Sequence, residues 1–154
     1  MPKDQSQTLR AHMTVHDAKA ALAFYAKAFG AVEQYRLVEP GTGRIGHAEI
    51  KIGDTVLMMN DEYPSFGAKS PNSIGGSPVA FYVQVPDADK AVDRAVAAGA
   101  TLVRPVQDQF FGDRSGMVAC PFGYRWSLSA IKEVVSPAEM QKRWSQMLES
   151  GKTE

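Results

Sequence analysis

The sequence contains one cysteine, Cys120, and only three histidines. A lone cysteine cannot form an internal disulfide, and scarce cysteine is typical of proteins from a reducing compartment. No base lies near Cys120 in the sequence, so we interpret it as a buried and unreactive thiol. Cysteine or histidine pairs at zinc spacing, glycine-rich phosphate loops and nucleophile elbows are also missing from the sequence.

Net charge and long apolar runs are missing as well. Lys+Arg and Asp+Glu both number 17, which gives a formal net charge of zero and argues against nucleic acid or an anionic membrane as a partner. No segment approaches the ~20 apolar residues of a membrane span. The polar N-terminal stretch lacks the apolar core of a signal peptide. We therefore expect a cytoplasmic protein.

A repeated pattern is the main positive feature. A predicted strand from Leu9 to Val15 leads to Asp17, and an alanine-rich helical stretch then ends at Gly30. The same order recurs from Asp87 to Gly99. Aspartate is a good helix N-cap and glycine a good helix stop. Hairpin signals follow both helices, and the last hairpin is predicted to begin with a strand from Gly116 to Cys120. One βαβββ module is therefore predicted to occur twice.

The predicted fold is α+β, with two βαβββ modules forming curved mixed sheets around a shared cleft, plus a C-terminal helix. At 154 residues the chain fits a single domain. The linker is rich in serine, glycine and proline, and it is either a mobile lid or simply slack. The predicted bounds are about 9–62 for module one, 63–78 for the linker, 79–131 for module two and 137–149 for the helix.

The C-terminal helix is predicted from a capping box that runs from Ser136 to Glu139. Met140, Trp144 and Met147 then form one apolar stripe. We expect this stripe to pack on the domain or on a second subunit.

Three groups of residues occur in an order and spacing that are specific in combination. They are Phe24-Tyr25…Phe29-Gly30, His47-Ala48…Ile52-Gly53-Asp54…Leu57-Met58, and Phe111-Gly112-Asp113-Arg114…Pro121-Phe122-Gly123-Tyr124-Arg125-Trp126-Ser127. This arrangement resembles the vicinal oxygen chelate superfamily of glyoxalases, bleomycin-resistance proteins and extradiol dioxygenases, and within it the PhnB-like branch. The resemblance covers roughly 9–131 and implies paired modules that enclose a cleft, usually in a dimer.

Metal-dependent members of that superfamily place four ligands on strand positions that face the cleft. The resemblance implies that these positions are Arg10, Leu57 or Met58, Ala80 and Ser127. None of them supplies the imidazole or carboxylate groups that hard or borderline cations need. We therefore expect a cleft without metal and no cofactor.

A displaced site is the alternative. His12, His47 and Glu49 share the strand parity that faces the cleft. Together they could bind a metal or act as acid and base, or they could simply line a wet cleft.

Strand parity and the loop at Phe110-Phe111 complete the expected ligand site. Aromatic rings and arginines suit an anionic or planar oxygenated small molecule, although structural salt bridges would explain the arginines equally well. Of the two adjacent phenylalanines, at least one should be buried. The expected ligand-binding residues are Arg10, His12, His47, Glu49, Tyr82, Gln84, Phe111, Arg125 and Ser127.

Three functions remain open at this point. The first is a glyoxalase- or bleomycin-resistance-like protein, a homodimer that binds a small organic ligand in a metal-free cleft. The second is a metal-dependent lyase, isomerase or dioxygenase with a displaced His/Glu site. The third is a dimeric domain that has lost its site. The sequence does not determine the ligand, whether the protein is catalytic, or whether the modules pair within one chain or across two.

Overall fold

The computed structural model describes residues 6–151. Residues 1–5 and 152–154, which the predicted domain includes, lie outside the described residues. The chain divides into two compact units, Met1–Ser77 and Pro78–Glu154.

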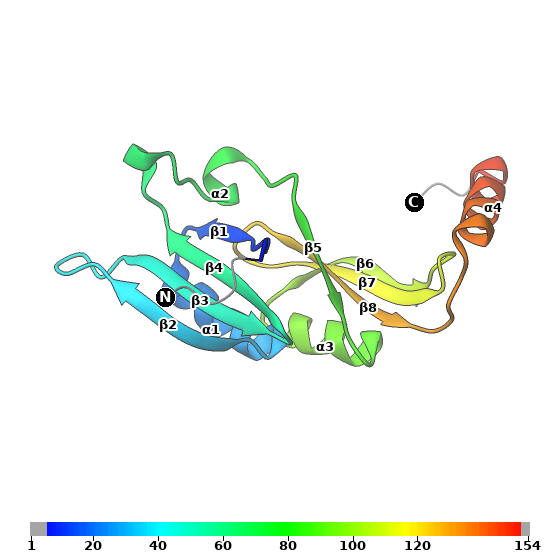
Figure 1. Cartoon of the computed structure of the whole chain (residues 1–154), viewed down its shortest axis with the longest axis horizontal. Helices are drawn as coiled ribbons and strands as arrows, with labels where there is room; N and C mark the ends of the chain where they lie inside the picture. The colour runs from blue at the N-terminus through cyan, green and yellow to red at the C-terminus, as the bar shows by residue number, and fades with distance from the viewer. Residues whose placement is uncertain (1–5, 152–154) are drawn as a thin grey trace. The chain divides into compact units, whose positions relative to one another are not determined.

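The first unit is a four-stranded mixed sheet with one helix against it. Strand β1 runs parallel to β4, and the other neighbours are antiparallel, in the order β1-β4-β3-β2 (Figure 1). Helix α1 contacts all four strands and covers one face of the sheet. The elements are β1 (His12–Val15), α1 (Ala18–Phe29), β2 (Val32–Val38), β3 (Ile45–Ile52) and β4 (Thr55–Asp61).

The second unit repeats this topology. Its strand order is β5-β8-β7-β6, with β5 parallel to β8. Helix α3 packs on β6, β7 and β8. The predicted α+β fold with two βαβββ modules is therefore confirmed. The elements are β5 (Ala80–Gln84), α3 (Ala88–Ala98), β6 (Thr101–Asp108), β7 (Asp113–Ala119) and β8 (Arg125–Ile131).

The helix ends follow the predicted caps. The Asp17 side chain accepts a hydrogen bond from the Ala20 N–H at 3.0 Å, and Asp87 accepts one from Lys90 at 3.1 Å. Gly30 ends α1 in the left-handed conformation, with φ 68°. Because these signals are local, they place both helices without help from tertiary contacts.

Two strands start at residues that differ from the prediction. Strand β1 begins at His12 rather than Leu9, because its pairing with β4 begins at His12 opposite Met58. Strand β7 begins at Asp113 rather than Gly116, because it pairs with Ile131 at the far end of β8. Partner strands decide these bounds.

Strand alternation places the core beneath the helices. Met13 and Val15 are buried in the first unit, and Trp126 and Leu128 in the second. The Phe81 ring stacks on Trp126 with centroids 4.6 Å apart. The opposite face of each sheet therefore carries the polar members of the strands.

The segment predicted as a linker contains local structure. It holds the short helices η1 (Pro64–Phe66) and α2 (Pro71–Ile74). Glu62, just after β4, accepts a hydrogen bond from the Ser70 N–H at 2.7 Å. The side-chain amide nitrogen of Asn72 lies 2.9 Å from the Nδ1 atom of His16. These bonds hold the segment against the rest of the first unit.

Helix α4 (Pro137–Glu149) lies where the capping box predicts it, with the Ser136 hydroxyl accepting from the Glu139 N–H. Arg143 joins it to its unit by an ion pair with Glu133 and a hydrogen bond to the Phe110 carbonyl. The Trp144 side chain is 46% exposed. Within residues 6–151 no helix is long and apolar enough to cross a membrane.

Candidate functional site

Each sheet presents one row of directly paired residues on the face that its helix leaves open. His12 and Tyr82 begin the two rows, each five residues before the aspartate that caps the following helix. The rows therefore occupy equivalent positions in the repeat. The first row is His12, Met58, Glu49 and Tyr35, and the second row is Tyr82, Ser127, Met117 and Arg104.

In the first unit, three of the predicted residues gather around a fourth, Glu49. The His47 Nε2 lies 3.2 Å from one carboxylate oxygen of Glu49, and the Arg10 guanidinium lies 3.5 Å from the other. The His12 and His47 rings meet edge to face at 5.8 Å. Tyr35, which the sequence analysis missed, donates its hydroxyl hydrogen bond to Glu49. We call these five residues the Glu49 cluster.

Hydrogen bonding sets the electrostatics of the Glu49 cluster. The Tyr35 hydroxyl, and after it His47, lowers the pKa of Glu49 below its ordinary value. The same bond raises the pKa of Tyr35. Both carboxylate oxygens already have partners, so Glu49 is held as an ionised acceptor with little capacity left for a cation.

The metal positions that the resemblance implies carry no metal-binding side chains. Of the two residues expected at the second position, Leu57 is buried on the helix face, whereas Met58 lies on the open face. With Arg10, Ala80 and Ser127, the donor set contains no imidazole or carboxylate. Among the residues that the structure describes, no three His, Cys, Asp or Glu side chains are placed to hold a metal ion.

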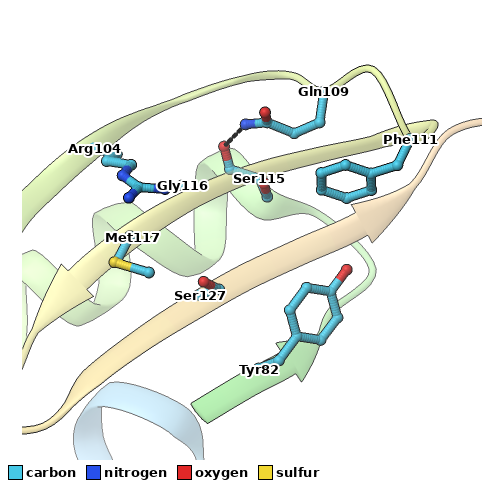
Figure 2. Close-up of a pocket in the computed structure, with 8 residues that line it drawn as sticks. All are labelled: Tyr82, Arg104, Gln109, Phe111, Ser115, Gly116, Met117 and Ser127. Atoms are coloured by element: carbon cyan, nitrogen blue, oxygen red, sulfur yellow. Dashed lines mark hydrogen bonds between the residues drawn. The ribbon is translucent and has the colours of Figure 1, made fainter. Parts of the chain in front are cut away.

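A cavity of about 230 Å³ opens over the second row (Figure 2). The predicted residues Tyr82, Phe111 and Ser127 line it. Figure 2 shows the Phe111 and Tyr82 rings at one end and Arg104 and Met117 toward the other. The remaining lining residues, which sequence reasoning missed, are Arg104, Gln109, Ser115, Gly116 and Met117.

The Phe110-Phe111 loop lies at one end of this cavity. The two rings meet edge to face at 5.3 Å. Both side chains are half-buried, so the expectation that at least one of them is buried is wrong. Each ring covers part of the apolar surface of the other, and the Phe111 ring also lines the cavity.

The wall beside Tyr82 is a hydrogen-bonded network. The hydroxyls of Tyr82 and Ser129 both donate to the Asp113 carboxylate, and Ser129 is fully buried. Partial burial, and then the bond to Asp113, raises the pKa of Tyr82. The network holds the Tyr82 ring in place and keeps Asp113 occupied.

Arg104 reaches the cavity through an irregularity in β6. The pairing with β7 shifts on both sides of Arg104, so that Pro105 and Val106 bulge opposite Gly116. Proline inside a strand is a signal of a bulge or an edge, and Pro105 could have revealed this position from the sequence.

Gln84 and Arg125 are the predicted residues that belong neither to the cavity lining nor to the Glu49 cluster. Gln84 pairs with Ser129 and Arg125 with Ala80, and both side chains are exposed. Arg114, from the motif that follows Phe111, pairs with the carboxylates of Asp89 and Asp108.

Comparisons with known proteins agree with this architecture. Residues 7–128 match the model of the Glyoxalase/Bleomycin resistance protein/Dioxygenase superfamily. The chain is 44% identical over 140 residues to Rv0887c of Mycobacterium tuberculosis, covering 89% of this chain and 82% of that protein.

Solved structures share the fold. The X-ray structure of the Arabidopsis thaliana At5g48480 product has a TM-score of 0.65 and 28% identity, over 80% of this chain and 98% of that one. The PhnB protein of Bacillus cereus has a TM-score of 0.62 over 80% and 99% of the two chains. It is 16% identical, so this likeness concerns the fold alone.

Proposed function

Because the chain belongs to the Glyoxalase/Bleomycin resistance protein/Dioxygenase superfamily, we propose that it binds a small organic ligand on the open face of its second sheet, without a metal. The order and spacing of the motifs in the sequence support a place in the PhnB-like branch. In this view the protein is a binder in the manner of the bleomycin-resistance proteins.

One observation carries the proposal: the cavity of about 230 Å³ over the second row combines apolar walls with a few polar groups. The Phe111 ring and the Met117 thioether supply the apolar surface. Ser127 and Gln109 supply hydrogen-bonding groups. This combination is typical of small-molecule sites, and the volume lies below the ~300 Å³ at which drug-sized pockets begin, which favours a compact ligand.

Two features support independence from metal. The four family positions hold Arg10, Met58, Ala80 and Ser127, which are not a cation-binding set. The Glu49 carboxylate, the strongest candidate for a displaced ligand, already accepts from Tyr35 and His47 and pairs with Arg10.

The experiment uses the Met117 methyl group as a reporter inside the cavity. Protein labelled with 13C at the methionine methyls is titrated with a library of small organic compounds, before and after treatment with a chelator. We expect some compounds to shift the Met117 signal with equal affinity in both states, and metal analysis to show well under one equivalent. Stoichiometric metal whose removal abolishes binding would contradict the proposal.

A cavity-filling variant provides the matched control. Ser127→Trp fills the space over the second row, whereas Met58→Trp makes the same kind of change at the equivalent position of the first row. We expect Ser127→Trp to abolish the Met117 response and Met58→Trp to preserve it.

The enzyme alternative has its own observation, the 3.2 Å contact between His47 Nε2 and Glu49. A histidine beside a carboxylate and a tyrosine can act in general acid–base catalysis, which favours a lyase or isomerase. A pH-dependent turnover that is lost in His47→Gln and retained in Ser127→Trp would support it. Turnover that instead requires an added divalent metal would support the displaced metal site.

We further infer that the partner is a small molecule rather than nucleic acid or a membrane, and that the protein is a cytoplasmic homodimer. The zero net charge and the single cysteine support the first two inferences. The stripe on α4, where the Trp144 side chain is 46% exposed, supports a second subunit. Sedimentation of Trp144→Glu against Lys142→Glu tests the dimer, since only the first variant changes the stripe.

A further inference from the structure

The cavity over the second row contains one charged side chain among its described lining residues, Arg104. We propose that this cavity recognises a carboxylate, and that Arg104 is the residue that selects it. The inference rests on the proposed function, because it assumes that the cavity binds a ligand, and it adds the chemical class of that ligand.

The acidic side chain beside the cavity already has partners. Asp113 accepts hydrogen bonds from Tyr82 and Ser129. The cavity therefore meets a guanidinium from β6, while this carboxylate is bound by two hydroxyls. A guanidinium matches a planar carboxylate in geometry and charge, and charged hydrogen bonds of this kind are the stronger ones.

The backbone brings Arg104 to this place. Arg104 pairs with Met117, while Pro105 and Val106 bulge over Gly116. A Cβ added to Gly116 would lie 2.8 Å from the Val106 side chain and 3.2 Å from the Arg104 carbonyl oxygen. Glycine at this position thus permits the close approach of the bulge, which in turn sets where Arg104 enters the cavity.

The rest of the lining suits the other end of such a ligand. Phe111 and Met117 offer an aromatic face and a polarisable thioether. Gln109 is oriented by its hydrogen bond to the Ser115 carbonyl, at 3.4 Å. A compact acid with an aryl or short alkyl body would place its charge at Arg104 and its body against these side chains.

The equivalent position of the repeat makes the assignment specific. In the first row the residue that corresponds to Arg104 is Tyr35, and its hydroxyl is engaged by Glu49. The guanidinium is thus particular to the second row, because the first row carries a phenol at this position.

The test compares acids with their neutral isosteres. Protein labelled at the methionine methyls is titrated with benzoate and benzamide, and with further acid and amide pairs of the same shape, while the Met117 signal is followed. We expect the wild type to prefer the acid by about tenfold, the value of one charge-assisted hydrogen bond. Arg104→Gln should bring the preference close to one. Arg125→Gln, which removes the same charge from an exposed site outside the cavity, should retain it.

The outcomes separate the two proposals. If acid and amide shift Met117 with equal affinity, the cavity binds ligands and the preference for carboxylates is wrong. If Arg125→Gln loses the preference as Arg104→Gln does, the overall charge of the unit is responsible and the assignment of Arg104 is overturned. If no pair shifts Met117 and the compound library is also silent, the proposed function itself fails.

Discussion

The Asp61 carboxylate accepts a hydrogen bond from the backbone N–H of Ala18 at 2.7 Å, which joins the end of β4 to the first turn of α1. Its second oxygen accepts from the Ile45 N–H, also at 2.7 Å, at the start of β3. One side chain thus satisfies backbone donors of two elements, and both donor residues are buried. The bond holds the helix to the sheet next to the end of β1, where Asp61 pairs with Val15.

The first prediction follows from this relationship. Asp61→Ala leaves both backbone donors without their partner, and each unsatisfied buried group costs about 1–3 kcal/mol. We expect the variant to lose at least about 2 kcal/mol of unfolding free energy in urea denaturation. Asp54→Ala, in the exposed turn between β3 and β4, is the control and should change stability by less than about 0.5 kcal/mol. An equal loss of unfolding free energy in both variants would show that the two Asp61 hydrogen bonds contribute no more than an exposed turn residue does.

The second prediction concerns Glu49. Its pKa lies below the ordinary value of 4.5, chiefly because of the Tyr35 hydroxyl. A lowered folded-state pKa stabilises the fold above the unfolded-state value, and this stabilisation is lost as the pH falls through the folded-state value. Tyr35→Phe should raise the pKa of Glu49 toward 4.5, as measured by 13C NMR of the side-chain carboxyls.

Glu39 is the internal control in the same spectra. Its pKa is lowered by Thr42 and Arg44 and should not change in Tyr35→Phe. A constant Glu49 pKa in this variant would mean that Tyr35 does not engage the carboxylate in solution.

The third prediction concerns the segment that was predicted as a linker, residues 63–78. The Ser73 hydroxyl, and after it the Ser70 N–H, lowers the pKa of Glu62 to about 2. The attachment of the segment should therefore be complete above pH 4.5 and be lost as the pH falls through about 2. Ser73→Ala should raise the pKa of Glu62, and Glu62→Gln should speed proteolytic cleavage between residues 64 and 78 at neutral pH.

Ser65→Ala serves as the control for the segment, since it changes an exposed serine of η1 that does not bond Glu62. Unchanged cleavage in Glu62→Gln would indicate that the segment is held by other contacts. If compounds that shift Met117 also slow cleavage, the segment acts as a lid. If they do not, the alternative gains support that the segment is only a connection without a role in binding.

The fourth prediction concerns Gly116. Gly116→Ala forces Val106 and the Arg104 backbone to move, because the new Cβ would meet them at 2.8 and 3.2 Å. Overpacking of this kind costs about 1–3 kcal/mol. We expect a lower melting temperature and a weaker preference for benzoate over benzamide. Gly46→Ala, whose Cβ would meet only the Tyr63 hydroxyl at an ordinary 3.5 Å, should show neither effect.

Helices were predictable to within a residue or so because their signals are local. Asp17, Asp87 and Ser136 each accept the backbone bond that the sequence pattern implies. Strand starts were less predictable, because β1 begins where β4 becomes available at Met58 rather than where its own apolar pattern begins.

The candidate site was predictable in part. Strand parity placed His12, His47 and Glu49 on one face, and the structure brings them together. Parity fails across an irregular strand, so the bulge at Pro105 hid Arg104 from the sequence analysis. Tyr35 was missed because no local signal pairs it with Glu49, 14 residues away.

The sequence by itself determined the repeated βαβββ module, the helix caps and the residue types at the family's metal positions, because each depends on neighbours along the chain or on chemistry alone. Tertiary structure decided which side chains of the open faces meet. The registers between strands place Tyr35 on Glu49 and Arg104 beside Met117, and those registers arise from long-range pairing that no local pattern encodes.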